Sequence, residues 1–187
     1  CLAVSCAALA CRIKAEISQV EIDRDYLLER IQHYWLSNIS PLEPRDCSAT
    51  CLFAFRFGDG LIHLGMLGDG LVAALKPDWS VVSLTEDKGY GFSNITTALS
   101  PNVSLNEWRH ISLPEEECIA VFLCTDGVVD DLDDVDGFVS GFIEAHCSIA
   151  EISANRRTRE MLEKWPTPKH SDDKTIACLF REDAPDA

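Results

Sequence analysis

The sequence has few basic residues for its length. Of its 187 residues, 16 are Lys or Arg and 31 are Asp or Glu, so the formal net charge is −15. Nucleic-acid backbones are bound mainly by Lys and Arg side chains, and this composition therefore argues against DNA or RNA as the principal partner. An anionic substrate remains compatible with the charge if cations lie between it and the protein.

Long hydrophobic runs are also missing, although 47% of the residues are hydrophobic. The apolar content predicts a folded chain that forms one domain with a buried core. The apolar runs are too short to span a membrane, so we expect no membrane partner. The opening stretch CLAVSCAALAC resembles the hydrophobic part of a signal peptide, but it lacks the basic residues that precede such a part. Its spacing favours a mostly buried helix, and we expect a cytoplasmic protein.

The nine cysteines do not form a recognisable metal or disulfide pattern. Cys47 and Cys51 are four residues apart, but no second pair completes a zinc site. Most cysteines lie in apolar runs, which favours reduced, buried thiols. The sequence also lacks a Gly-x-Ser-x-Gly nucleophile elbow, a Walker loop and internal repeats.

The hydrophobic periodicity predicts helices at both ends and strands in the middle, an α+β arrangement. In the second helix, Leu27, Ile31 and Trp35 recur at four-residue spacing, and Asp23 can cap its start. We interpret Gly68-Asp69-Gly70 as an interruption within one long strand. The predicted helices cover 2–15, 23–37, 136–150 and 151–164, and the predicted strands cover 50–57, 61–67, 71–75, 81–82, 108–113, 118–124 and 174–180.

Three aspartates stand at predicted strand ends beside small or polar residues: Asp69 in GDG, Asp126 in TDG and Asp172 in SDDKT. Each aspartate alone is typical of a turn, because its side chain bonds nearby backbone groups. Asp126 is the most suggestive, because it follows the apolar strand VFLC and precedes Gly127, which allows a turn or a close-lying ligand. Together, carboxylates from separate hairpins predict a Mg²⁺ or Mn²⁺ site.

These motifs resemble those of a known family. The segments GMLGDGLVAAL (65–75), LCTDGVVDDL (123–132) and SDDKTIACLF (171–180) look like three ordered motifs of the metal-dependent protein phosphatases of the 2C type, and CSATCLF (47–53) is similar to the strand that begins that family's first central hairpin. The bacterial branch is the most similar. The resemblance implies a sandwich of two antiparallel sheets flanked by helix pairs (αββα), formed by a single domain over residues 1–187.

The resemblance also implies a function. Members of the family hydrolyse phosphoserine and phosphothreonine in proteins with a water activated by two Mg²⁺ or Mn²⁺ ions, sometimes with a third. By motif position, Asp126, Asp172 and Asp69 correspond to metal ligands, whereas Asp173, Gly127 and Gly70 correspond to supporting positions behind them. A phosphorylated protein substrate and a kinase that opposes the enzyme would be the implied partners.

The sequence departs from the family pattern at its start. The family has an Asp-Gly-x-Gly motif before its first helix, and the Asp of that motif bridges both metals. This chain opens directly on what resembles the first helix, so we expect the N-terminal strand and first metal motif to be missing from it.

Two other functions remain open. The chain could be a catalytically silent module that binds a phosphoprotein, or an acidic structural protein whose aspartates only make turns. The acidic run 130–136 does not have the spacing of a calcium-binding loop, and most of its residues are expected to be solvated or to cap helices. His63 is expected at the surface or facing a neighbouring strand, and His170 is the one histidine close in sequence to the expected site.

Overall fold

The structure is a computed structural model that describes residues 2–18, 23–85, 97–166 and 172–181. The chain divides into two compact units, Cys1–Asp69 with Glu86–Glu116 and Gly70–Thr85 with Glu117–Ala187. Each unit has one antiparallel sheet and its own helices. The predicted fold class, α+β with two antiparallel sheets and accompanying helix pairs, is therefore confirmed.

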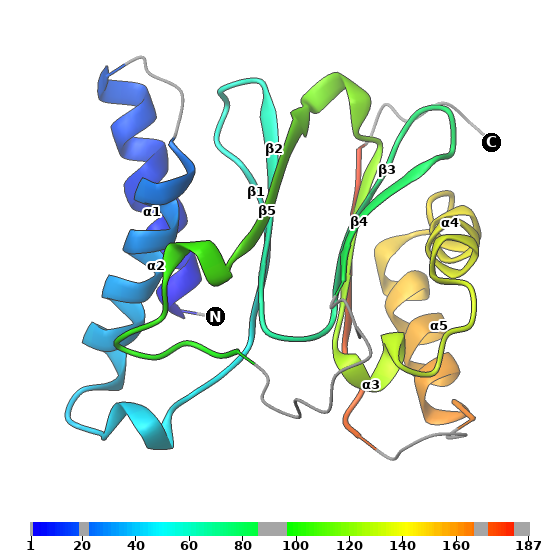
Figure 1. Ribbon diagram of the computed structural model, residues 1–187. Coiled ribbons are helices and arrows are strands. Elements are labelled where there is room, and N and C mark those ends of the chain that lie inside the picture. Colours follow the sequence, from blue (N-terminus) through cyan, green and yellow to red (C-terminus); the bar gives the residue numbers. More distant parts are fainter. Residues whose placement is uncertain (1, 19–22, 86–96, 167–171, 182–187) are drawn as a thin grey trace. The chain divides into compact units, whose positions relative to one another are not determined.

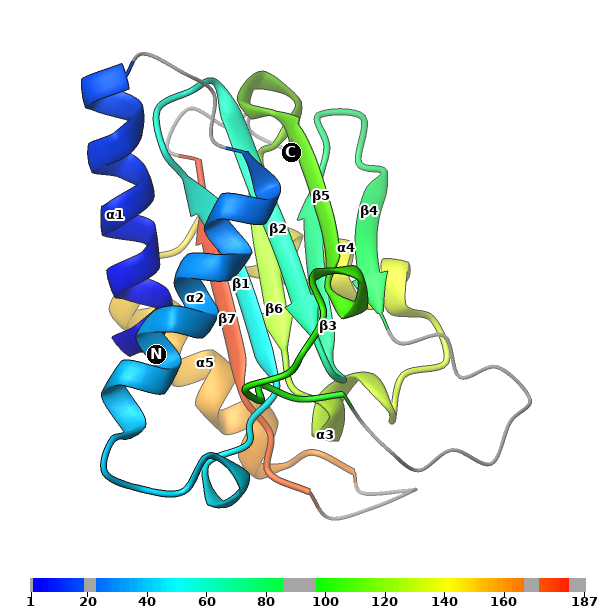
Figure 2. The same ribbon diagram turned by 60° about the vertical axis from the view of Figure 1, so that its left-hand side comes forward.

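The first unit has a three-stranded sheet in the order β1-β2-β5. Its strands are β1 (Cys51–Arg56), β2 (Leu61–Leu67) and β5 (Arg109–Pro114). The helices α1 (Leu2–Ser18) and α2 (Arg24–Ile39) lie side by side and cover one face of this sheet (Figures 1 and 2). Residues of both helices form one hydrophobic core with residues of β1 and β2.

The two helices bury their apolar faces to different extents. On α2, Leu27, Ile31 and Trp35 are buried, and the side chain of Asp23 caps the helix by accepting a hydrogen bond from the Tyr26 N–H, as predicted. On α1, Ala3, Ala7 and Cys11 are buried, whereas Leu2, Leu9 and Ile13 are exposed. The expectation of a mostly buried first helix was therefore wrong for one of its faces.

A glycine shapes the centre of the first sheet. Gly65 on β2 pairs with Phe53 on β1, and a Cβ atom at Gly65 would collide with the Phe53 ring. The ring can therefore lie flat across β2 only because residue 65 has no side chain. Three short 3-10 helices complete the loops of this part of the chain, at Pro44–Asp46, Leu105–Glu107 and Glu115–Glu117.

The second unit has a four-stranded sheet in the order β4-β3-β6-β7. The strand β6 (Ala120–Cys124), which leads to Asp126, lies between two neighbouring strands. The helices α4 and α5 cover one face of this sheet, where Phe122, Phe142 and Ile143 are buried in one core. The elements of this unit are β3 (Leu71–Leu75), β4 (Val81–Thr85), β6 (Ala120–Cys124), α3 (Asp126–Val129), α4 (Val135–His146), α5 (Glu151–Glu163) and β7 (Ile176–Phe180).

The segment Gly68-Asp69-Gly70 does not interrupt one strand, and that interpretation was wrong. It joins β2 of the three-stranded sheet to β3 of the four-stranded sheet. Gly68 and Gly70 have φ angles of 94° and 112°, which L-residues with a side chain rarely adopt. A Cβ atom at Gly68 would also lie 2.5 Å from a methyl carbon of Thr50. These glycines therefore let the chain leave one sheet and enter the other.

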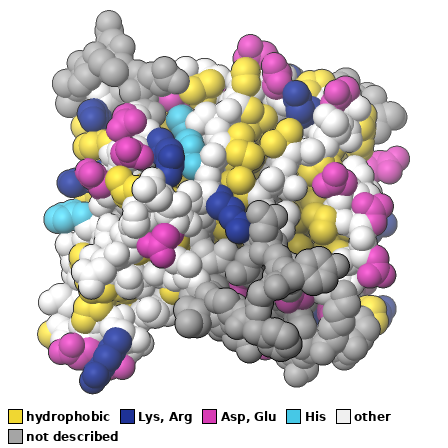
Figure 3. Space-filling model, in the orientation of Figure 1, with side chains coloured by type: hydrophobic (Ala, Val, Ile, Leu, Met, Phe, Trp, Pro, Cys, Tyr) yellow, Lys and Arg dark blue, Asp and Glu magenta, His cyan; other side chains and the backbone are white. Residues whose placement is uncertain are grey.

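Acidic side chains outnumber basic ones. On the face drawn in Figure 3, acidic and basic side chains are both dispersed, with more acidic than basic ones, in agreement with the net charge of −15. In the part of the chain that the structure describes, no helix is both long enough and apolar enough to cross a bilayer.

Candidate metal centre

The carboxylate of Asp126 is held at the end of a buried strand. β6 ends at Cys124, Thr125 occupies the N-cap position, and Asp126 is the first residue of the short helix α3 rather than part of a simple turn. Its Oδ1 atom accepts a hydrogen bond of 2.8 Å from the N–H of Gly127, and its backbone oxygen accepts one of 2.9 Å from the N–H of Asp130. The first bond restricts the direction in which this carboxylate can point, and the second holds the backbone that carries it.

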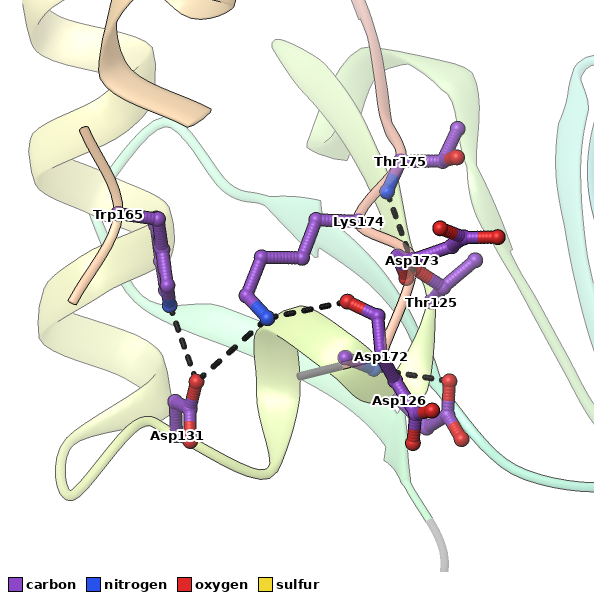
Figure 4. Close-up of polar contacts among 9 residues, drawn as sticks. Thr125, Asp126, Asp131, Trp165, Asp172, Asp173, Lys174 and Thr175 are labelled. Atoms are coloured by element: carbon purple, nitrogen blue, oxygen red, sulfur yellow. Dashed lines mark hydrogen bonds and ion pairs between the residues drawn. The ribbon is translucent and has the colours of Figure 1, made fainter. Parts of the chain in front are cut away.

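The segment that carries Asp172 is tied to the end of β6 by three hydrogen bonds. The Thr125 hydroxyl donates to the backbone oxygen of Asp173 (3.1 Å) and accepts from the N–H of Thr175 (3.0 Å). The backbone N–H of Thr125 donates to the oxygen of Thr175 at 3.1 Å. We call this place, formed by Thr125–Gly127 and Asp172–Thr175, the crossing (Figure 4).

Gly127 allows the two segments of the crossing to approach closely. A Cβ atom at Gly127 would lie 2.5 Å from the backbone oxygen of Asp173 and 3.1 Å from that of Asp172. The sequence suggested that Gly127 leaves room for a turn or a ligand, but the group that lies against it is the chain's own backbone. Glycine at this position therefore brings the segments of Asp126 and Asp172 together.

The crossing offers hard oxygen donors. Figure 4 draws the carboxylates of Asp126 and Asp172 on the same side. Asp126 is partly exposed and Asp172 is exposed. Mg²⁺ is commonly bound by one or two carboxylates while it keeps several waters, so this pair fits such an ion chemically. Among the described residues, no three or more His, Cys, Asp or Glu side chains are grouped so that they could hold a metal.

Asp69 and Gly70 lie in the connection from β2 to β3. The Asp69 residue is partly buried, and Gly70 is buried. Because Gly68 and Gly70 on either side both have positive φ angles, the backbone around Asp69 is held in a conformation that suits glycine. Asp69 belongs to the first unit, whereas Asp126 and Asp172 belong to the second.

A buried ion pair lies against the crossing, and the sequence did not predict it. The side chains of Lys174 and Asp131 are only 8% and 2% exposed, and the Lys174 Nζ atom is 3.8 Å from Oδ2 of Asp131. The same Nζ donates a hydrogen bond of 3.2 Å to the backbone oxygen of Asp172. Trp165, just after α5, donates from Nε1 to Oδ2 of Asp131 at 3.1 Å. Figure 4 shows the ammonium between the carboxylate and the carbonyl.

The position of Asp131 is an exception within the acidic run 130–136. The expectation of solvated or helix-capping residues holds for Asp134, whose side chain accepts a hydrogen bond from the N–H of Gly137 at the start of α4. Asp131 follows Gly127 by four residues and Val128 by three, so it continues the buried face of the α3 turn. This helical spacing was the available signal in the sequence.

The cysteine next to the crossing does not provide a nucleophile. Burial raises the pKa of Cys124 to about 12, and the nearby negative charge of Asp126 adds to the shift. A thiol with such a pKa stays protonated near neutral pH, whereas cysteine catalysis needs a thiolate. Cysteine-based phosphoryl transfer at this site is therefore disfavoured.

An open groove lies beside the crossing in the same unit. It has a volume of about 640 Å³ and runs between α5 and the segment of Asp172–Ile176. Apolar side chains of Leu162 and Trp165 and the cationic side chains of Arg159 and Lys174 line it. The groove thus places mixed apolar and charged surface next to Asp172.

His63 is buried, so the expectation that it lies at the surface was wrong, whereas the alternative that it faces a neighbouring strand is confirmed. It is 2% exposed and faces its cross-strand partner Ser112, whose Oγ lies 3.1 Å from its Nδ1 atom. Its Nε2 atom lies 2.9 Å from Oδ2 of Asp59, in the β1–β2 turn. Because a carboxylate can only accept, Nε2 is the donor in its contact with Asp59. His170 lies outside the described residues.

Most of the chain matches a single protein-family model. The model described as "Protein phosphatase 2C" matches residues 2–165. This range contains Asp69 and Asp126 and ends before Asp172. No curated protein matches the sequence closely enough to be counted as a relative.

Solved structures with a similar fold include several phosphatases. The catalytic domain of the serine/threonine protein phosphatase PstP, determined with two manganese ions, has a TM-score of 0.58 at 17% identity; the match covers 94% of this chain and 78% of that one. A bacterial serine phosphatase, determined as a point mutant, has a TM-score of 0.54 at 14% identity, with coverages of 84% and 66%.

A third similar structure is a sex-determining protein from C. elegans. Its TM-score is 0.57 at 16% identity, and the match covers 91% of this chain but 50% of that one. The chain thus spans only half the length of this protein. At such identities the similarity shows the fold alone.

Proposed function

The chain belongs to the protein phosphatase 2C family, and from this we propose that it forms the core of a metal-dependent phosphatase that hydrolyses phosphoserine and phosphothreonine in proteins. The observation that supports this most directly is the crossing. It brings the segments of Asp126 and Asp172 together through the hydrogen bonds of Thr125 and the close approach at Gly127.

In this proposal, Asp126 and Asp172 hold Mg²⁺ or Mn²⁺, and Asp69 contributes a further carboxylate. Two ions are expected, or three if Asp69 holds one of its own. Asp173 and Gly127 support the site through their backbones, since one accepts from Thr125 and the other permits the contact. Gly70 lets the chain turn immediately after Asp69.

The ions would supply what the side chains lack, namely a water-derived nucleophile at neutral pH and positive charge to offset the phosphoryl oxygens. This explains how a protein with a net charge of −15 can accept an anionic substrate, because bound cations reverse the local field. The protein's own contribution is to fix the carboxylates, since a preorganised site does not have to be ordered during the reaction.

The groove beside Asp172 fits a peptide chain that continues from a phosphorylated residue. Its apolar side chains, Leu162 and Trp165, suit peptide side chains, and its charged lining has Arg159 paired with Glu163 at 3.8 Å. A phosphorylated protein and an opposing kinase are the partners that this function requires.

The proposal is tested by hydrolysis of phosphoserine and phosphothreonine peptides by the full-length protein with Mn²⁺, and again after removal of metal with EDTA. We expect turnover that depends on Mn²⁺ and that falls at least ~100-fold in D126N, because changes behind a metal ligand already cost about 10–100-fold. The matched control is D133N, which removes the same charge from an exposed aspartate nearby.

Each outcome decides between functions. Equal turnover in D126N and the unchanged protein would refute the site. Tight binding of phosphopeptides without turnover, with or without Mn²⁺, would favour a silent phosphoprotein-binding module instead.

A further inference from the structure

We propose that Lys174, Asp131 and Trp165 form a clamp that positions the Asp172 segment for metal binding. This inference rests on the proposed function, and it assigns a task to three residues that lie outside the family motif positions for metal ligands. Lys174 and Asp131 are positioning residues in this proposal, because they act through Asp172 and Asp126 rather than on the substrate.

The Lys174 ammonium contacts both Asp131 and the backbone of Asp172. It is held between a carboxylate oxygen of Asp131 (3.8 Å) and the backbone oxygen of Asp172 (3.2 Å). The side chains of Lys174 and Asp131 are 8% and 2% exposed, so solvent screens their ion pair little. The position of the Asp172 carbonyl, and with it the start of the Asp172 side chain, therefore depends on this ammonium.

Asp131, at the other end of the clamp, is attached to the turn that carries Asp126. Asp131 follows the short helix α3, whose first residue is Asp126, and its backbone N–H donates to the oxygen of Val128 at 3.2 Å. Trp165 donates to the Asp131 carboxylate from beyond α5. The clamp thus joins three segments: the turn that carries Asp126, the end of α5 and the segment that carries Asp172.

A buried oxygen without a hydrogen-bond partner indicates that the clamp is not the most stable arrangement available. Oδ1 of Asp131 is buried and has no partner among the described residues. A buried ion pair with such an oxygen stabilises a fold poorly, and an apolar pair of similar volume is often at least as stable. A role in placing the metal ligands, in addition to any role in folding, would explain why this position has an ion pair.

Positioning and electrostatics predict opposite effects of removing Lys174. The loss of a cation near a metal site should by itself strengthen binding of Mn²⁺, because repulsion falls. If Lys174 positions Asp172, the K174M variant should instead bind Mn²⁺ ~10-fold or more weakly, as is typical when a group that orients a metal ligand is lost. K174R, which keeps a cation and donors, should recover most of the affinity.

The test measures Mn²⁺ affinity by calorimetry on the full chain, with K76M as the matched control. Lys76 also pairs with an acid in the same unit, Glu117 at 2.9 Å, but it does not contact the crossing. The double variant D131N/K174M removes both charges, and the new asparagine can still accept from Trp165, so that no buried charge is left unpaired. The clamp predicts that this double variant regains stability but not Mn²⁺ affinity, whereas a merely structural role predicts that both recover.

Hydrogen exchange of the metal-free protein gives a readout that does not depend on the proposed function. The N–H of Thr175 donates to Thr125 within the crossing. We expect it to exchange at least ~10-fold faster in D131N/K174M, relative to amides between β3 and β6, and to be unchanged in K76M.

Failure of the clamp and failure of the proposed function give different experimental results. Unchanged exchange at Thr175 overturns the clamp, whether or not Mn²⁺ binds. Faster exchange in a protein whose unchanged form binds no Mn²⁺ overturns its role in metal binding together with the proposed function, and leaves a clamp that only orders the segment.

Discussion

Two buried carboxylates, one in each unit, are satisfied to very different degrees. The side chains of Asp59 and Asp131 are 6% and 2% exposed. Both oxygens of Asp59 accept hydrogen bonds, from the N–H of Leu61 (3.1 Å) and from His63 (2.9 Å). Asp131 has the Trp165 bond and the Lys174 ion pair on one oxygen, and its other oxygen has no partner among the residues described.

The difference separates a network that serves the fold from one that lies at a site. A fully satisfied polar network makes a structure rigid and unique. A partly satisfied one is unfavourable for folding and needs an explanation. The Asp59 network ends at Ser112 and holds a hairpin together, whereas the Asp131 network continues to the backbone of Asp172. We therefore expect changes in the first to affect stability alone and changes in the second to affect metal binding as well.

The largest loss of stability is expected for D131A. It leaves the Lys174 ammonium buried without its counterion and removes the acceptor of Trp165, so the free energy of unfolding should fall by about 3–5 kcal/mol. Chemical denaturation measures this effect. A loss no greater than that of D59A would remove the contrast between the two networks.

A smaller loss is expected for G127A. The added methyl group would lie 2.5 Å from the backbone oxygen of Asp173, so the segments of the crossing must move apart, and such overpacking costs about 1–3 kcal/mol. Because the displaced segments carry Asp126 and Asp172, Mn²⁺ affinity should fall too. Calorimetry with Mn²⁺ checks this, with G141A on α4 as control, where a Cβ atom meets nothing within 4 Å. Unchanged affinity in a destabilised G127A would contradict the role of the crossing.

For the Asp59 network, D59N should lower stability by about 1–2 kcal/mol without changing Mn²⁺ affinity, because a charge-assisted bond becomes a neutral one. Burial alone would raise the pKa of Asp59, but the hydrogen bonds from His63 and Leu61 outweigh it and hold the pKa below its ordinary value. A lowered pKa stabilises the fold above the unfolded pKa of about 4, and this contribution is lost as the pH falls through the folded value. Denaturation at pH 7 and pH 3 should show a smaller difference in stability between D59N and the unchanged protein at pH 3 than at pH 7.

The smallest effect is expected for H110F, and it should depend on pH. Burial, with the nearby charges of His63 and Arg24 opposed by Asp25, lowers the pKa of His110 to about 4. The folded state therefore resists protonation, and His110 should destabilise the fold progressively as the pH falls from about 6.5 to 4. Phe at this position does not titrate, so the dependence of stability on pH should be shallower in H110F. A slope equal to that of the unchanged protein would contradict the assignment.

Local patterns in the sequence predicted most of the secondary structure. Asp23 as a helix cap and the four-residue spacing of Leu27, Ile31 and Trp35 are signals contained within one segment, and the structure bears them out. The segment Gly68–Gly70 was misinterpreted because glycines with positive φ look the same in a sequence whether the next strand continues the same sheet or enters another.

The candidate site could be predicted only in part. Asp126 and Asp172 were selected by their position at strand ends, and their motifs pointed to the family. The burial of Asp131 and His63 was missed because it depends on partners distant in sequence, Lys174 and Trp165 for one and Ser112 for the other. Such partners are brought together by sheet register and helix packing, which the composition of a short window does not reveal.

The most direct test of the central claim, that the crossing holds a divalent cation, is a titration of the chain with Mn²⁺ in which free Mn²⁺ is counted by electron paramagnetic resonance. The claim predicts that the unchanged protein and D133N take up Mn²⁺ alike, and that D126N and D172N each lose uptake at the same site. Uptake by D126N and D172N equal to that of the unchanged protein would contradict it.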